Sequence, residues 1–176
     1  MIQLHDLEFT PFISEEEILH SISKISEEIN REYEGKILVF LGILNGAFLV
    51  ASEIIKRFPA DCEVNFVKLG SYEGTSTTGN VSTLLGLTQN LKGREVVIIE
   101  DIVDTGNTLA AIDKILMDME VSGYKIATLF LKPHAYKKSY PIDFVGMEIP
   151  NDFIVGYGLD YNGLGRNLTQ VYKLKE

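Results

Sequence analysis

The sequence predicts an α/β fold in which a mainly parallel sheet is flanked by helices. Short apolar runs of strand length alternate along the chain with longer segments whose apolar residues recur at helical spacing. Strands and helices that alternate in this way favour parallel strands joined by helical crossovers. The length of 176 residues suits one domain with a normal core, and neither a linker nor an internal repeat interrupts it. We therefore expect a single domain over residues 1–176.

The first element is a helix, indicated by a capping box. Ser14 stands at the N-cap position, and Glu17 stands three residues later, where its carboxylate can return a hydrogen bond. Isoleucines at helical spacing follow, so we expect the helix to run to about Tyr33, just before Gly35. Its acidic start is the first turn of a helix rather than a binding patch.

The later elements follow from apolar runs and the residues that end them. Two further helices are expected, at 47–58 before Pro59 and at 107–120. Expected strands are 36–44, 63–69, 84–87, 94–99, 124–131, 144–147 and 153–156. Ligands of such sheets bind at the carboxyl ends of the strands.

Composition narrows the class of protein. The chain is 45% hydrophobic and 23% charged, as in ordinary globular proteins, and no apolar run approaches the roughly 20 residues of a membrane span. The first residues lack the basic and apolar regions of a signal peptide. Cys62 is the one cysteine, which excludes an internal disulfide and suits a reducing compartment. We expect a cytoplasmic protein without membrane contact.

One segment combines an apolar strand, two acids and a turn before a helix. The run 96–99 is followed by Glu100 and Asp101, and then by the turn 104–108. Carboxylates accept hydrogen bonds from ribose hydroxyls, and the N–H groups of a turn and a helix N-terminus bind phosphate. A solvated strand end is the alternative, but adjacent acids repel each other unless a ligand or metal uses them. The segment therefore predicts a sugar-phosphate site.

The net charge of −9 constrains how phosphate would be held. It argues against nucleic-acid binding, which needs a basic surface. A phosphate-binding enzyme with few basic residues commonly relies on backbone N–H donors and a divalent cation. We therefore expect Mg²⁺.

The segment 96–108 resembles the 5-phosphoribosyl pyrophosphate (PRPP) motif of the type I phosphoribosyltransferases, in the form of their hypoxanthine-guanine branch. A lone Asp-Thr-Gly could be an ordinary turn, whereas its strand–turn–helix context is specific. The resemblance extends over 36–168. It implies a hood built from the N- and C-terminal segments, and Mg²⁺-dependent transfer of phosphoribose from PRPP to hypoxanthine and guanine in purine salvage.

The resemblance also implies roles for the residues of the motif. Asp104 would be the catalytic base that takes the proton from purine N7. Glu100 and Asp101 would hold the ribose hydroxyls together with Mg²⁺. The residues implied in binding ribose and the 5-phosphate are Glu100, Asp101, Asp104, Thr105, Gly106, Asn107 and Thr108.

The turn of Leu44, Asn45 and Gly46 resembles the pyrophosphate loop of the family, in which a non-proline cis peptide turns N–H groups toward the ligand. Spacing alone allows a plain strand–helix turn equally well. Many family members have lysine at the position of Asn45, so the resemblance supports a backbone role rather than a side-chain cation. Arg166 would also contact pyrophosphate.

Four residues are implied in binding the purine and the metal. Lys132 would donate to the 6-oxo group, Phe153 would stack on the ring, and the backbone of Ile154 would pair with the base edge. Asp160 would hold Mg²⁺ beside the pyrophosphate. Taken singly, each of these would be read as a solvated charge or a core residue.

The polar segment 71–83 admits two interpretations. It is a surface loop, or it is a lid whose Ser71 and Tyr72 close over the reacting centre and exclude water, as in the family.

Two alternatives to this function stay open. Some proteins with the PRPP motif are regulators that sense PRPP or nucleotides and need a basic face or an added DNA-binding domain, of which this sequence shows no sign. A phosphoribosyltransferase that prefers xanthine is the other. The family is usually dimeric or tetrameric, so the resemblance implies a homodimer or homotetramer.

Overall fold

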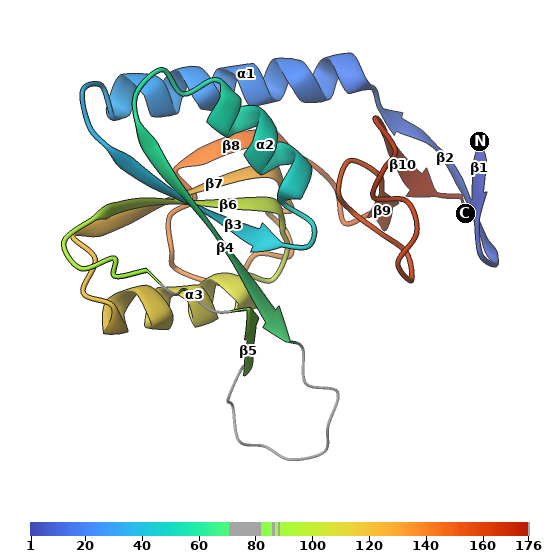
Figure 1. Cartoon of the computed structure of the whole chain (residues 1–176). Coiled ribbons are helices and arrows are strands. Elements are labelled where there is room, and N and C mark those ends of the chain that lie inside the picture. Colours follow the sequence, from blue (N-terminus) through green and yellow to red (C-terminus); the bar gives the residue numbers. More distant parts are fainter. Residues whose placement is uncertain (71–81, 86, 88, 176) are drawn as a thin grey trace.

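The computed structural model describes residues 1–70, 82–85, 87 and 89–175. In these residues no helix is both long and apolar enough to cross a membrane. The elements, shown in Figure 1, are β1 (Ile2–Leu4), β2 (Leu7–Ile13), α1 (Glu15–Glu32), β3 (Leu38–Leu44), α2 (Phe48–Lys56), β4 (Cys62–Gly70), β5 (Ser82–Leu85), β6 (Glu95–Val103), α3 (Asn107–Asp118), β7 (Gly123–Leu131), β8 (Phe144–Glu148), β9 (Ile154–Val155) and β10 (Val171–Leu174).

The larger sheet has the strand order β5-β4-β3-β6-β7-β8. All its pairs are parallel except β4 with β5 at one edge, which confirms the predicted mainly parallel sheet. From β3 the chain moves outward to β4 and β5, and then returns to β6 on the other side of β3. The order therefore reverses between β3 and β6, where the loops after the two strands diverge and leave a crevice for a ligand.

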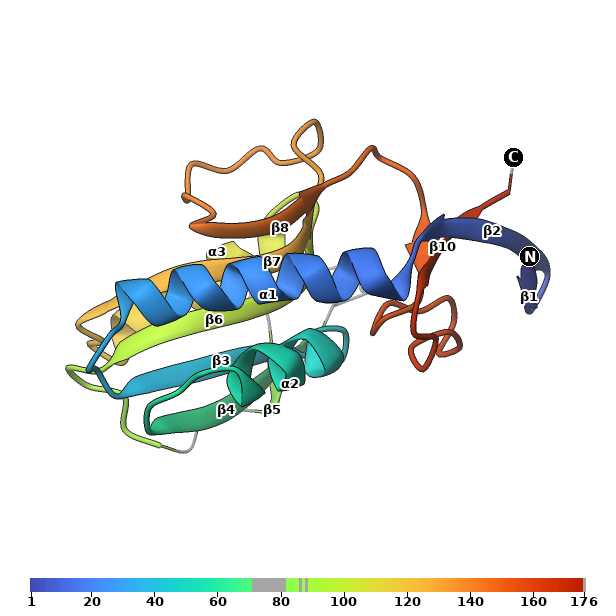
Figure 2. The same cartoon turned by 90° about the horizontal axis from the view of Figure 1, so that it is seen from above.

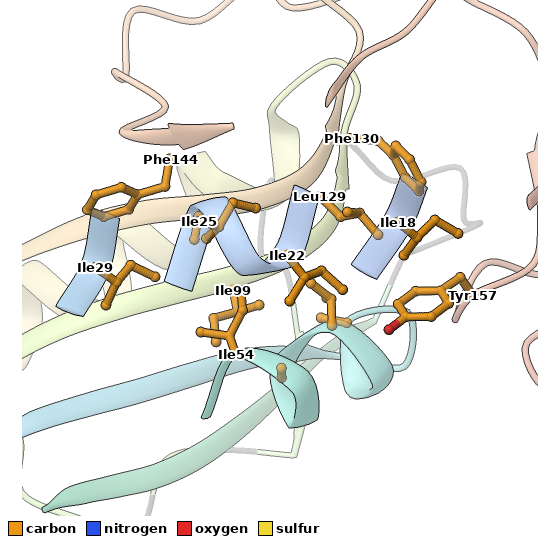
Figure 3. Packing of buried hydrophobic residues seen from close by; sticks show 14 of the residues in the cluster. Ile18, Ile22, Ile25, Ile29, Ile54, Ile99, Leu129, Phe130, Phe144 and Tyr157 are labelled. Carbon is orange, nitrogen blue, oxygen red and sulfur yellow. The ribbon is translucent and has the colours of Figure 1, made fainter. Parts of the chain in front are cut away.

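Helices cover both faces of this sheet. Helices α1 and α2 lie over one face, and α3 lies over the other (Figures 1 and 2). Figure 3 shows the isoleucines of α1 turned toward the sheet and packed with residues of α2, β6, β7 and β8. The labelled members from α1 are Ile18, Ile22, Ile25 and Ile29, all at most 1% exposed. A second cluster under α3 seals the other face.

The capping box before α1 is formed as predicted. The Ser14 hydroxyl accepts a hydrogen bond from the Glu17 N–H at 3.3 Å, and the Glu17 carboxylate accepts one from the Ser14 N–H at 2.9 Å. Two N–H groups at the helix start are satisfied in this way.

The motif strand is longer than predicted, which corrects the expectation that the acids follow its end. Strand β6 continues to Val103, so Glu100 and Asp101 lie inside it. The cause is the neighbouring strand β7, which pairs Glu100 with Thr128 and Val103 with Leu131 and so keeps the chain extended.

The smaller sheet forms the predicted hood from the two ends of the chain. Its order is β1-β2-β10-β9, with antiparallel pairs throughout. It lies beside the end of the larger sheet, and both termini are in it (Figure 1). Its individual strands β1, β2 and β10 were not predicted, because their pairing joins segments from opposite ends of the chain.

Candidate functional site

Two adjoining clefts lie at the carboxyl ends of the parallel strands. The first, which we call the turn cleft, has a volume of about 340 Å³. It is lined by Ile43, Leu44, Gly46, Leu69, Glu100, Asp101, Ile102, Val103, Asp104, Thr105, Gly106, Asn107, Thr108 and Leu109. The second, the lysine cleft, has a volume of about 230 Å³. It is lined by Gly46, Asp101, Ile102, Asp104, Lys132, Phe153, Ile154, Leu159, Asp160 and Arg166. The four residues common to both make one continuous site.

The structure thus brings together nearly all the candidate residues. Every residue implied in binding ribose and 5-phosphate lines the turn cleft, as do Leu44 and Gly46. The lysine cleft is lined by Lys132, Phe153, Ile154, Asp160 and Arg166, whereas the implied metal residue Glu100 lines the turn cleft alone. Asn45 is exposed and belongs to neither lining. Ser71 and Tyr72 lie outside the described residues. The individual roles of all the candidate site residues stay predictions.

The N-terminus of α3 is suited to an anion. Its N-cap is Gly106, whose φ of +79° is in the left-handed region that favours glycine. No side chain caps the helix there, and the first turn holds no acid. The N–H groups are therefore available to a ligand in the turn cleft. A Cβ on Gly106 would come within 2.6 Å of the Tyr136 ring, so this close approach also requires glycine.

The turn after β3 is packed against two other segments. The Leu44–Asn45 peptide bond is cis, as the resemblance implied. A Cβ on Gly46 would lie 1.7 Å from Oδ2 of Asp101, and a Cβ on Gly158 would lie 2.1 Å from the carbonyl oxygen of Gly46. Only glycines allow these three segments to meet. Gly158 was not identified from the sequence as a site residue. The Gly-Tyr-Gly stretch in which it lies was a signal that another backbone segment approaches closely there.

The two adjacent acids are buried, so the alternative of a solvated strand end is wrong. Glu100 is 6% exposed and Asp101 is 8% exposed. Burial, and next the charge of Asp101, raise the pKa of Glu100 well above its usual value. Burial raises the pKa of Asp101 to about 6, although the hydrogen bond from the Ile102 N–H at 3.0 Å and the Arg166 charge oppose the shift. Positive charge therefore compensates the burial of these carboxylates only in part.

The lysine cleft holds a different set of charges. Lys132 is 8% exposed, and its ammonium lies 3.5 Å from Oδ2 of Asp104. Arg166 contacts Oδ1 of Asp160 at 2.6 Å and donates to the carbonyl of Gly158 at 2.6 Å. Phe153, at the edge of the cleft, is 44% exposed, unusually open for its type. The cleft therefore offers a cation, a carboxylate and an aromatic face.

The acids fit a Mg²⁺ ion that arrives with a phosphate ligand. Among the described residues, no group of three or more Asp, Glu, His or Cys side chains is close enough to hold a metal by itself. Mg²⁺ usually binds to one or two carboxylates and completes its coordination with substrate phosphates and water. The buried carboxylates of Glu100 and Asp101, whose charge is only partly balanced by nearby positive charge, supply oxygen donors of that kind, as does Asp160 in the adjoining cleft.

Comparison with known proteins gives concordant results. Residues 14–162 match the model of the phosphoribosyl transferase domain. A hypoxanthine-guanine phosphoribosyltransferase of Staphylococcus aureus is 38% identical over 164 residues, which are 93% of this chain and 92% of the relative.

Solved structures agree. A crystal structure of a hypoxanthine phosphoribosyltransferase from Staphylococcus aureus has a TM-score of 0.88 and 37% identity, covering 97% of this chain and 92% of that one. A hypoxanthine phosphoribosyl transferase of Trypanosoma cruzi has a TM-score of 0.88 at 27% identity, covering 99% and 95%.

Replacing Gly46 by alanine should destabilise the protein. The added methyl group would overlap the Asp101 carboxylate, so we expect Gly46→Ala to lower the free energy of unfolding by roughly 1–3 kcal/mol. Denaturant unfolding measures this. Gly123→Ala is the matched control, because no heavy atom lies within 4 Å of the position of its Cβ. Equal losses in both variants would contradict the contact.

The free protein should gain stability at neutral pH when Asp101 becomes asparagine. The pKa of Asp101 is raised from 3.8 to about 6, so the folded protein binds a proton at this carboxyl more tightly than the unfolded chain does. The stability that this proton contributes is fully present below pH 3.8 and is lost as pH rises through 6. The amide of the variant would not titrate. We expect Asp101→Asn to be more stable than the parent at pH 8, by at most about 3 kcal/mol, and equal to it near pH 4. Calorimetry without metal tests this, and a difference independent of pH would contradict it.

Proposed function

The chain belongs to the phosphoribosyltransferase family, in its hypoxanthine-guanine branch, and on this premise we propose that it is an enzyme of purine salvage. It transfers the 5-phosphoribosyl group of PRPP to hypoxanthine and guanine, and it releases pyrophosphate. The site chemistry agrees with this activity, because an N–H-lined turn, buried acids and a base-sized cleft adjoin one another. The cytoplasm is the proposed location, and a homodimer or homotetramer is the proposed assembly.

The pairing of Lys132 with Asp104 is the observation that carries the proposal. O6 and N7 are neighbouring atoms on one edge of a 6-oxopurine. The lysine ammonium can donate to O6, while the carboxylate 3.5 Å away can accept a hydrogen bond from N7–H. Phe153 and the backbone of Ile154 border the same cleft, where they would contact the ring and its other edge. This arrangement supports recognition of a 6-oxopurine.

The turn cleft is where we place PRPP. The 5-phosphate lies against the N–H groups and hydroxyls of the turn 104–108, and the ribose hydroxyls meet Glu100 and Asp101. The pyrophosphate lies toward Gly46 and Arg166, at the junction of the two clefts. Glu100, Asp101 and Asp160 would hold a Mg²⁺ ion that arrives with PRPP, and such an ion would supply the positive charge that neutralises the departing pyrophosphate.

The reaction then needs one proton transfer to the protein. The bond between C1 of ribose and the pyrophosphate oxygen breaks, and a bond from C1 to N9 of the purine forms. The N7 proton passes to Asp104, which is half exposed and lines both clefts. Lys132 holds O6 throughout, which orients the base for attack.

The PRPP-sensing regulator is the less favoured candidate. A regulator that binds nucleic acid needs a basic surface, whereas this chain carries a net charge of −9. A preference for xanthine stays an alternative, since xanthine also carries a 6-oxo group. Comparing turnover of xanthine with that of hypoxanthine and guanine decides between them.

Turnover of PRPP should depend on the purine offered and on Mg²⁺. We expect hypoxanthine and guanine to be converted, and adenine to be rejected by about 10⁴-fold, because its 6-amino donor would face the Lys132 donor. Release of pyrophosphate, measured with each purine with and without Mg²⁺, tests this. Lys132→Met is the control, since it should lower turnover of 6-oxopurines and reduce the discrimination. If no purine supports turnover of PRPP, the proposed function is wrong.

Replacement of Asp104 by asparagine should lower the chemical rate selectively. Asparagine keeps the size of the side chain but cannot accept the N7 proton, so we expect kcat to fall by roughly 10²–10⁴-fold. Affinity for PRPP, measured by calorimetry with Mg²⁺, should change little. An unchanged kcat would remove Asp104 from the role of base.

A further inference from the structure

The ring of Phe153 is held by two other aromatic rings of the hood. Its centroid lies 6.1 Å from that of Phe9 with planes at 45°, and 5.9 Å from that of Tyr161 with planes at 84°. Phe9 and Tyr161 also contact each other, at 6.2 Å. Each ring of this aromatic triad therefore touches the other two, in the tilted and edge-on geometries that aromatic pairs favour.

The members of the aromatic triad differ in burial. Phe9 lies in β2 and is fully buried, while Phe153 is 44% exposed at the lysine cleft. A half-exposed phenylalanine has few contacts of its own to fix its ring. The orientation of the Phe153 face thus depends on Phe9 and Tyr161 behind it.

Tyr161 is in turn fixed by the turn between β1 and β2. Its hydroxyl donates to Oδ1 of Asp6 at 2.8 Å, and its ring meets the His5 ring edge-on at 5.7 Å. His5 also contacts the carbonyl oxygen of Asn162 at 3.2 Å through Nε2. The N-terminal hairpin therefore holds the segment after β9 at three points.

The same segment carries Asp160 on its other side. Asp160 lines the lysine cleft, accepts a hydrogen bond from the Gly163 N–H at 2.7 Å and contacts Arg166. Neighbouring residues of this loop thus point two ways: Asp160 toward the cleft, and Tyr161 toward the hairpin. Asp160 is held by its own contacts with Gly163 and Arg166, so the anchor on Tyr161 acts on the aromatic face rather than on the acidic side of the cleft.

We propose that Tyr161, anchored by Asp6 and His5 of the N-terminal hairpin, is a positioning residue that sets the plane of Phe153 for stacking on the purine. This inference rests on the proposed function, because it assumes that Phe153 stacks on the base. It gives the first residues of the chain, which lie in the hood and line neither cleft, a part in purine affinity.

The proposal predicts a selective loss of purine affinity in the full-length enzyme. We expect Tyr161→Leu to raise the KM for hypoxanthine by about threefold to tenfold, the scale of one aromatic pair, with the KM for PRPP changed less than twofold. Tyr161→Phe keeps the ring contacts but loses the hydrogen bond to Asp6, so its KM for hypoxanthine should lie between those of the parent and of Tyr161→Leu. A KM for PRPP that rises in parallel would overturn the proposal.

Two further variants separate positioning from general loosening of the hood. Tyr172→Leu is the matched control, because Tyr172 lies in the same hood cluster as Phe9 but forms no aromatic pair with Phe153 among the described residues. It should leave the purine KM near that of the parent, and an equal rise there would overturn the proposal. In a Phe153→Leu background, Tyr161→Leu should add no further rise, whereas additive effects would show that Tyr161 acts independently.

The same experiment distinguishes failure of this inference from failure of the proposed function. If Phe153→Leu raises the purine KM and Tyr161→Leu does not, only the positioning role is wrong. If neither variant changes the purine KM, the base does not stack on Phe153, and the assignment of the lysine cleft fails with it. If the parent enzyme does not consume PRPP with any purine, the proposed function itself is wrong.

Discussion

The burial of two neighbouring carboxylates in β6 is the constraint on which the site depends. Glu100 and Asp101 lie in the strand rather than beyond it, because β7 pairs alongside and keeps the chain extended. Their charged forms are disfavoured there, which leaves a deficit of positive charge. The proposed Mg²⁺ ion, arriving with its phosphate ligand, would correct that deficit. An acidic protein can thus bind a highly anionic substrate without a cluster of basic residues.

Two glycines connect this acidic pair to the rest of the site. Gly46 lies against the Asp101 carboxylate, and Gly158 lies against the carbonyl of Gly46, so the turn after β3, the strand β6 and the hood loop share one contact region. Arg166 donates to the carbonyl of Gly158 and contacts Asp160. Because atoms this closely packed cannot move separately, a displacement of one segment must displace the other two.

The hood supplies part of the proposed purine-binding cleft. The larger sheet supplies Lys132 from the end of β7, while the hood supplies Phe153, Ile154, Asp160 and Arg166. The hood is itself a sheet that joins the N-terminal hairpin to β10 and β9. The proposed purine pocket is therefore assembled from the middle and both ends of the chain, and its geometry depends on how well the small sheet is formed.

The sequence by itself determined the alternation of helices and strands, the capping box before α1, and the resemblance of segment 96–108 to the PRPP motif. These are local features, since the period of apolar residues and the order of acids, glycine and threonine can be read within a short window. The position of Glu100 and Asp101 inside β6, the pairing of β2 with β10, and the contact of Phe153 with Phe9 were decided only by tertiary structure. The distance between Lys132 and Asp104, and the contact of Gly46 with Asp101, were decided at that level too. Each joins segments far apart in the chain, and no local pattern encodes how closely two such segments pack.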